Sequence, residues 1–187
     1  IILDEIETGA DTPIEWIQHG LESLEVDEKE QSWMFTTQDY FEGDTVKLYG
    51  NIITEGVDFE WGETFTSNSE DNEAPYIMAK TKGPQQLCTV LIPLNGSMEL
   101  PSLEKISSKK TQNCFKITHE NTTDLFWSIS KAEDKITEKA DGWIPKAASF
   151  HLRTNQTQNL FSIGFENATS LSYDDVNYLK SSDPISG

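Results

Sequence analysis

Apolar and polar residues alternate along much of this sequence, and no other feature constrains its fold as strongly. Val46 and Leu48 fall on one face of an expected strand, and Lys47 and Tyr49 fall on the other. Successive side chains of a β-strand point to opposite faces, so this pattern predicts strands with one buried face. The pattern, or a similar short apolar segment, recurs at residues 31–36, 75–81, 85–93, 112–119, 125–129, 150–153 and 158–165.

Turn-forming residues separate these segments, as in Glu42-Gly43-Asp44 and Lys82-Gly83-Pro84. Many short strands at this spacing predict an all-β fold, an antiparallel β-sandwich. Apolar residues at helical spacing are nearly absent from the sequence. Residues 102–110 and 132–140 have room for one helical turn each, but their charges favour loops.

The composition indicates one domain with a substantial core. The chain has 187 residues, 36% of them hydrophobic, and we expect a single β-sandwich over residues 1–187. There are 14 Lys and Arg against 32 Asp and Glu, for a net charge of -18. Such a charge repels nucleic acid and anionic membranes, so we expect neither as a partner. The longest apolar run, Cys88–Pro93, is the length of a strand and too short to span a bilayer.

The sequence opens in an apolar run with no initiator Met and no signal peptide, so we expect a module of a longer protein. Its two cysteines, Cys88 and Cys114, fall in different expected strands. They are consistent with a disulfide in an oxidising compartment and equally with two buried thiols. Four Asn-x-Ser/Thr triplets are better evidence for exposed turns than for glycosylation. These triplets begin at Asn95, Asn121, Asn155 and Asn167.

Chemistry-bearing motifs are scarce. The sequence contains no Gly-x-Ser-x-Gly elbow, no Cys-x-x-Cys, no His-x-x-x-His and no Gly-rich phosphate loop, so we expect no cofactor and no metal. Of its three histidines, His151 alternates outward beside Arg153, and His119 ends an expected strand before a turn. His19 differs because it closes a strand that contains Trp16 and directly precedes a glycine. Its imidazole is the candidate proton donor or orienting group, with a plain strand-end role as the alternative.

The tryptophans offer candidate sugar-stacking groups, although aromatic residues of a β-domain more often lie in its core. Trp127 alternates with Leu125 and Ile129 and is expected in the core. Trp61, between acidic and glycine neighbours, is the tryptophan expected to be exposed. We therefore take Trp16, next to the strand end at His19, and Trp61 as the candidate substrate-binding residues.

The order of these features resembles the C-terminal β-sheet domain of the heparinase II/III-like polysaccharide lyases, over most of the chain. The resemblance begins with Ile2-Leu3-Asp4-Glu5, followed after a turn by Trp16-Ile17-Gln18-His19. It continues through Gly43–Leu48 and the proline-ended strand Thr89–Pro93. The segment from Gly142-Trp143-Ile144 to Phe165–Leu171 is similar to the closing hairpin of the family.

The resemblance implies a helical toroid followed by a large antiparallel β-sandwich, with polysaccharide in the cleft between them. Such enzymes cleave uronic-acid polymers, such as glycosaminoglycans or alginate, by β-elimination, and they are secreted or periplasmic. In the family the toroid supplies the neutralising Asn or His and the Tyr acid or base, and the β-domain supplies a further histidine. His19 is the position that matches the context of that histidine, and without the toroid the chain is expected to be inactive. Some members hold zinc through two histidines and an aspartate, but no second histidine stands suitably beside His19 and Asp39.

Two further readings stay open. The first is a non-catalytic carbohydrate-binding or cell-surface β-sandwich, which would present an aromatic platform such as Trp61. The second is a structural interaction domain, whose largest apolar patch would lie away from any histidine. A lyase module should instead present His19 on a concave sheet face, together with an apolar patch where the toroid docks.

Overall fold

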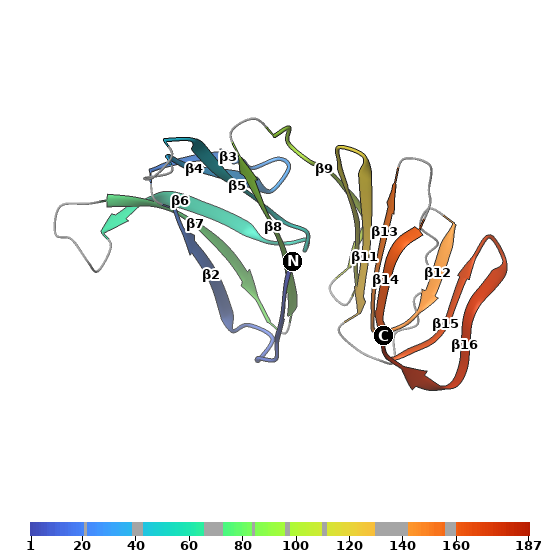
Figure 1. The fold of residues 1–187 in the computed structure, drawn as a ribbon. Coiled ribbons are helices and arrows are strands. Elements are labelled where there is room, and N and C mark those ends of the chain that lie inside the picture. Colours follow the sequence, from blue (N-terminus) through green and yellow to red (C-terminus); the bar gives the residue numbers. More distant parts are fainter. Residues whose placement is uncertain are drawn as a thin grey trace. The chain divides into compact units, whose positions relative to one another are not determined.

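The fold is described from a computed structural model of the chain. It describes residues 1–20, 22–38, 43–65, 73–83, 85–95, 98–109, 112–129, 142–155 and 160–187. The chain forms two compact units, unit 1 from Ile1 to Leu100 and unit 2 from Pro101 to Gly187. Each unit consists of antiparallel sheets, and Figure 1 shows strands in both.

Unit 1 contains a five-stranded sheet in the order β1-β8-β5-β4-β3 and a three-stranded sheet in the order β2-β7-β6. Every pairing within these two sheets is antiparallel. The strands are β1 (Ile2–Ile6), β2 (Pro13–His19), β3 (Ser23–Asp27), β4 (Ser32–Gln38), β5 (Thr45–Ile52), β6 (Asp58–Phe65), β7 (Glu73–Lys82) and β8 (Gln85–Asn95).

The core of unit 1 lies between its two sheets. Trp33 and Phe35 of β4 contribute from the five-stranded sheet, and Ile77 and Ala79 of β7 contribute from the three-stranded sheet. Buried residues on the inner faces of two sheets are the defining feature of a β-sandwich. The Nε1–H of Trp33 donates a hydrogen bond to Oε1 of Gln18 at 3.1 Å, which joins β4 to β2 through the core.

Unit 2 repeats this architecture with a five-stranded sheet, β14-β13-β11-β10-β9, and a three-stranded sheet, β12-β15-β16. Its strands are β9 (Ser102–Lys109), β10 (Gln112–His119), β11 (Thr122–Ile129), β12 (Trp143–Lys146), β13 (Ser149–Asn155), β14 (Leu160–Glu166), β15 (Ala168–Tyr173) and β16 (Val176–Ile185).

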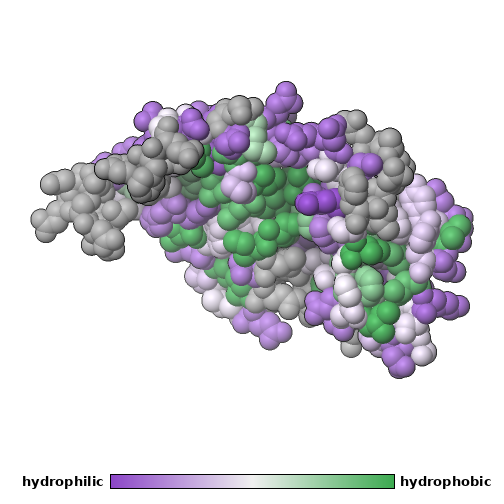
Figure 2. Space-filling view, in the orientation of Figure 1, coloured by the Kyte–Doolittle hydropathy of each residue, from purple (hydrophilic) through white to green (hydrophobic). Residues whose placement is uncertain are grey.

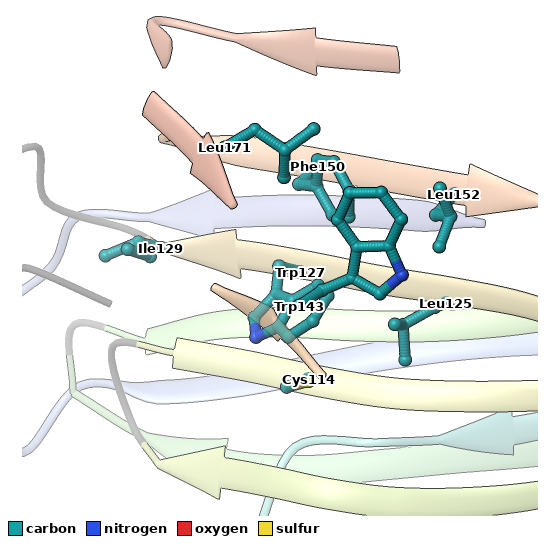
Figure 3. Close-up of a cluster of buried hydrophobic side chains, with 8 residues drawn as sticks. All are labelled: Cys114, Leu125, Trp127, Ile129, Trp143, Phe150, Leu152 and Leu171. Carbon is teal, nitrogen blue, oxygen red and sulfur yellow. The ribbon is translucent and has the colours of Figure 1, made fainter. Parts of the chain in front are cut away.

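The core of unit 2 is aromatic. Figure 3 shows Trp127, Trp143 and Phe150 within one buried cluster, to which both sheets contribute. The Trp127 and Phe150 rings lie 5.4 Å apart, and the Trp143 and Phe150 rings lie 6.2 Å apart. Trp127 is only 2% exposed, which confirms its expected core position.

The last residues of the chain extend along the edge of β14. The N–H of Phe165 donates to the carbonyl of Gly187 at 2.8 Å, and the N–H of Gly187 donates back to the carbonyl of Phe165 at 3.0 Å. Since β14 is the outer strand of its sheet, these two bonds occupy part of an edge that would otherwise be open.

The all-β antiparallel sandwich expected from the sequence is confirmed. The expected strand that ends at His19 is β2, and the other expected segments correspond to β4, β5, β7, β8, β10, β11, β13 and β14, with residues 158–159 outside the described residues. The expectation of a loop or helical turn at residues 102–110 is wrong, because residues 102–109 form β9. A bulge shifts the register of β9 at Ile106, so Ser107 pairs with Cys114 whereas Lys105 pairs with Phe115. This extra residue interrupts the period of two and hides the strand from pattern reading. Residues 132–140, the second expected loop, lie outside the described residues.

The division into two units differs from the single sandwich expected over residues 1–187. Each unit has its own pair of sheets and its own buried cluster, and among the described strands no sheet combines strands from both units. A domain of roughly 100 residues is long enough to enclose a core of its own. The length and the overall hydrophobic fraction of the chain did not distinguish one large core from two smaller ones.

The four Asn-x-Ser/Thr triplets begin at strand ends or in turns, as expected. Asn95 and Asn155 are the last residues of β8 and β13, and Asn121 and Asn167 lie between paired strands. Asn95, Asn121 and Asn167 are exposed, while Asn155 is half-buried. In its described part the chain forms no helix with the length and apolar character needed to cross a membrane.

Candidate functional site

His19 is the last residue of β2, and its side chain is exposed. Burial alternates along β2, so His19 lies on the sheet face that points away from the core. The N–H of Gly20 donates to the carbonyl of Pro75 at 2.8 Å, which ties the end of β2 to β7. The candidate histidine therefore stands at a strand end and is open to solvent.

Tyr76 of β7 is the cross-strand neighbour of His19. Their ring centroids lie 6.3 Å apart with an interplanar angle of 48°. On its other side Tyr76 pairs with Gly62 of β6, where an added Cβ would lie 3.3 Å from Cε1 of Tyr76. The absence of a side chain at Gly62 thus leaves room for the phenol ring. Three strands together place an imidazole and a phenol next to each other.

We call the outer face of the β2-β7-β6 sheet the His19 face. Its residues are Glu15, Ile17, His19, Asp58, Glu60, Gly62, Tyr76, Met78 and Lys80. Ile17 is 46% exposed, so the face combines apolar surface with polar groups. Figure 2 shows hydrophobic and hydrophilic residues next to each other on the visible face of the molecule.

Glu60 organises the polar part of the His19 face. Its carboxylate accepts a hydrogen bond from the hydroxyl of Tyr76 at 3.3 Å and forms an ion pair with Lys80. The hydrogen bond from Lys80 lowers the pKa of Glu60, and the same bond raises the pKa of Lys80. Glu60 therefore contacts both Lys80 and the hydroxyl of the phenol that lies beside His19. An imidazole, a phenol and a carboxylate in this arrangement can donate and accept hydrogen bonds to a polyol.

Trp16 does not share the His19 face. It lies three residues before His19 on the same strand and points inward, where its ring packs 5.7 Å from the ring of Trp33. Side chains alternate between the two faces along a strand, so residues three apart lie on opposite faces of the sheet. Its predicted role in substrate binding remains a prediction, and its contacts are those of a core residue.

Trp61 is exposed over 42% of its surface, as expected from its neighbours. Its cross-strand partner is the buried Ile77, whereas Gly62, the next residue, pairs with Tyr76. Trp61 therefore lies on the core-facing side of the sheet, on its edge strand β6. The structure does not bring His19, Trp16 and Trp61 together on one surface.

A second polar cluster, not anticipated as a unit from the sequence, lies on the five-stranded sheet of unit 2. Asp124 of β11 accepts hydrogen bonds from Nε and Nη2 of Arg153 at 2.7 and 2.9 Å. The same carboxylate lies 2.9 Å from Nε2 of His151. The His151 ring stacks on Phe126 with 4.2 Å between centroids and 3° between planes. Sequence reasoning noted that His151 and Arg153 share a face, but only the β11–β13 register reveals Asp124 as their partner.

The electrostatics of Asp124 identify this cluster as a cross-strand clamp. Burial acts to raise the pKa of Asp124, but the hydrogen bonds from His151 and Arg153 and the charge of Arg153 outweigh it and lower that pKa. The same hydrogen bond raises the pKa of Arg153. An ionised Asp124 accepts hydrogen bonds only, so Nε2 of His151 is the donor. With both carboxylate oxygens engaged, the clamp joins β11 to β13, and we assign it a structural role.

The remaining candidates are structural. His119 ends β10, and its carbonyl accepts a hydrogen bond from Oγ1 of Thr122, in agreement with a strand-end role. Cys88 and Cys114 are buried thiols, one in each unit, which favours that reading over a disulfide. Burial raises the pKa of the Cys88 thiol to about 12, so it stays protonated and unreactive at neutral pH. Among the described residues, no three His, Cys, Asp or Glu side chains lie close enough to hold a metal ion.

The accessible imidazole and phenol of the His19 face are therefore the strongest candidate site in the part of the chain that the structure describes. In comparisons with known proteins, no family model matches this chain, and no curated protein matches it.

Proposed function

We propose that this chain is the β-sandwich part of a polysaccharide lyase that cleaves uronic-acid polymers by β-elimination. The His19 face would form one wall of the substrate cleft. The observation that carries the proposal is the position of His19, which is exposed at a strand end and paired across the strands with Tyr76. A histidine enclosed by aliphatic side chains would not have been compatible with this role.

The chemistry of β-elimination suits such a wall. The proton α to the uronate carboxylate leaves, a carbon–carbon double bond forms, and the bond to the β-oxygen breaks. Negative charge develops on the carboxylate, and the departing oxygen takes up a proton. In this proposal His19 contacts the sugar or assists proton transfer. Tyr76, held by Glu60, limits the orientations available to the sugar beside it.

A helical toroid domain is the proposed partner, because the resemblance assigns to it the neutralising residue and the tyrosine acid or base. We therefore expect the isolated chain to bind polysaccharide without cleaving it. Release of unsaturated product, measured by ultraviolet absorbance with the isolated chain, would contradict this division of the catalytic residues.

Binding can be tested with the histidines as internal probes. Side-chain ¹H–¹³C spectra of the chain contain signals from His19, His119 and His151. Titration with alginate or heparan sulfate oligosaccharides should shift the His19 signal and leave the His151 signal in place. The variant His19→Ala should lose about tenfold in affinity, as expected for one hydrogen bond to a charged group. Lys29→Ala, an exposed change in the β3–β4 turn, is the matched control.

The same variant tests catalysis in an enzyme that includes the helical domain. His19→Ala should reduce kcat there, whereas Lys29→Ala should leave it unchanged. Unaltered turnover of the His19→Ala enzyme would remove His19 from the mechanism.

A non-catalytic carbohydrate-binding module is the second candidate, and charge favours it. The net charge of -18 and the carboxylates Glu15, Asp58 and Glu60 on the His19 face repel a polyanionic substrate. This candidate predicts retention of neutral polysaccharide, little binding of uronate polymers, and no effect of His19→Ala on any turnover.

A further inference from the structure

Tyr178 occupies an irregular position on β16, the outer strand of the β12-β15-β16 sheet. In the β15–β16 register, Leu171 pairs with Leu179 and Ser172 pairs with Asn177. Tyr178 lies between Asn177 and Leu179 and is therefore the extra residue of a β-bulge. Bulges redirect a side chain away from the direction that regular alternation would give it, and they are frequent near functional sites.

The Tyr178 ring packs against buried aromatic side chains. Its centroid is 5.4 Å from that of Trp143, which in turn packs 4.9 Å from Tyr173 and 6.2 Å from Phe150. Trp143 is 8% exposed, whereas Tyr178 is 60% exposed. Figure 3 shows Trp143 within the buried cluster of unit 2. The outermost ring of an aromatic cluster that begins in the core is thus largely exposed to solvent.

The hairpin that precedes Tyr178 is fixed by its backbone. Asp174 and Asp175 have φ angles of 43° and 66°, the left-handed values that a two-residue type I′ turn requires. The N–H of Asp174 donates to the carbonyl of Gly142 at 3.1 Å, so the turn is tied to the residue before Trp143. At Gly142 an added Cβ would lie 2.6 Å from Cε2 of Tyr173, and a glycine is needed there. The hairpin that carries Tyr178 is therefore connected to Trp143 by a backbone hydrogen bond as well as by ring packing.

The groups around Tyr178 indicate the chemistry of a ligand. Asp175 and Asn177 are exposed and precede the ring on the hairpin, where a carboxylate and an amide can bond to hydroxyl groups. Val176 is 58% exposed and adds apolar surface. Two successive aspartates in a chain of net charge -18 oppose an anionic ligand. A flat aromatic face with such polar groups on neighbouring residues of the same hairpin matches an uncharged sugar ring, which presents C–H groups on one face and hydroxyls at its rim.

We propose that Tyr178, supported by Trp143, is a stacking platform for the pyranose ring of a neutral polysaccharide, with Asp175 and Asn177 as its polar partners. This site belongs to unit 2, involves none of the His19 face, and does not rest on the proposed lyase function.

Native affinity gels of the whole chain test the proposal. The gels contain xylan, galactomannan or hydroxyethyl cellulose as neutral polymers, and alginate as the anionic comparison. We expect at least one neutral polymer to retard the chain. The variant Tyr178→Ala should weaken that binding by about five- to tenfold, since one aromatic stacking contact is lost. Tyr178→Phe keeps the ring and should retain most of the affinity, and Asp175→Ala should weaken it.

The controls separate this site from the His19 face and from loss of folding. His19→Ala should bind the neutral polymer as strongly as the parent chain, even if it abolishes binding of a uronate polymer. Tyr178→Ala should keep the circular dichroism spectrum and the thermal unfolding midpoint of unit 2, because its ring is largely exposed. The proposal is overturned if no neutral polymer retards the chain, if Tyr178→Ala binds as well as Tyr178→Phe, or if His19→Ala abolishes the retardation.

Discussion

Replacing Gly50 by alanine tests the packing that supports the strand of His19. Gly50 of β5 is the cross-strand partner of Trp33, and the indole lies over it. An added Cβ would lie 2.1 Å from Cε2, 2.3 Å from Cζ2 and 2.5 Å from Nε1 of Trp33. Each of these separations is well below the 3.4–4 Å of ordinary van der Waals contact. Trp33 is 2% exposed, so its ring has no solvent side into which it can move.

The cost of this substitution has two main parts. Forcing an extra methyl group into a packed core costs about 1–3 kcal/mol. Moving the indole also strains the hydrogen bond from Nε1 to Gln18, which is worth about 1 kcal/mol. Replacing glycine by alanine also restricts the unfolded chain, which raises the free energy of unfolding by less than about 1 kcal/mol. We therefore expect Gly50→Ala to lower the free energy of unfolding by about 2–3 kcal/mol.

Urea titration followed by tryptophan fluorescence measures this loss. Gly62→Ala is the matched control, because its Cβ would lie 3.3 Å from a half-exposed Tyr76 ring that can yield. We expect that variant to lose less than about 1 kcal/mol. If Gly50→Ala and Gly62→Ala unfold at the same urea concentration, the described fit between Trp33 and the β5 backbone is incorrect.

Three further predictions concern the clamp, a turn and a thiol. Because the pKa of Asp124 is lowered, its contribution to stability is complete above the ordinary aspartate pKa and is lost as pH falls through the lowered value. In thermal unfolding, Asp124→Asn should therefore lower the free energy of unfolding by about 1–2 kcal/mol at pH 7, and the difference from the parent chain should shrink toward pH 3. Gly142→Ala should destabilise unit 2 by about 2 kcal/mol or more in chemical denaturation, because φ is +85° there and the Cβ would collide with Tyr173. Cys88 should resist iodoacetamide at pH 8 in the folded chain and react once unit 1 unfolds, as mass spectrometry would record; rapid labelling of the native chain would contradict its burial.

The strands with uninterrupted alternation were predictable from the sequence. Regular alternation in β11 and β13 shows which face of each strand is buried, and the structure agrees. In β5 it holds only in part, because Val46 of the expected buried face is 37% exposed and Asn51 of the opposite face is 2% exposed. β9 could not be recognised, because the bulge at Ile106 interrupts the alternation of its side chains in the middle of the strand. β6 was also missed, because Gly62 and the acidic residues of its sequence weaken a strand signal.

The candidate site was predictable only in part, for reasons that differ between residues. The exposure of His19 at a strand end could be anticipated from its position before Gly20. The inward direction of Trp16 could also be predicted from the sequence. Positions 16 and 19 lie three apart on one strand, so their side chains point to opposite faces. The partnership of Asp124 with Arg153 was not available, since alternation specifies faces and leaves strand pairing and register open. The bulge that directs Tyr178 onto Trp143 depends on register in the same way.

The paired hydrogen bonds between Phe165 and Gly187 have a practical consequence for any shortened version of this chain. Deleting the final few residues would expose backbone donors and acceptors along β14, and another molecule could add a strand there. Truncated preparations should then self-associate at lower concentration than preparations that retain Gly187.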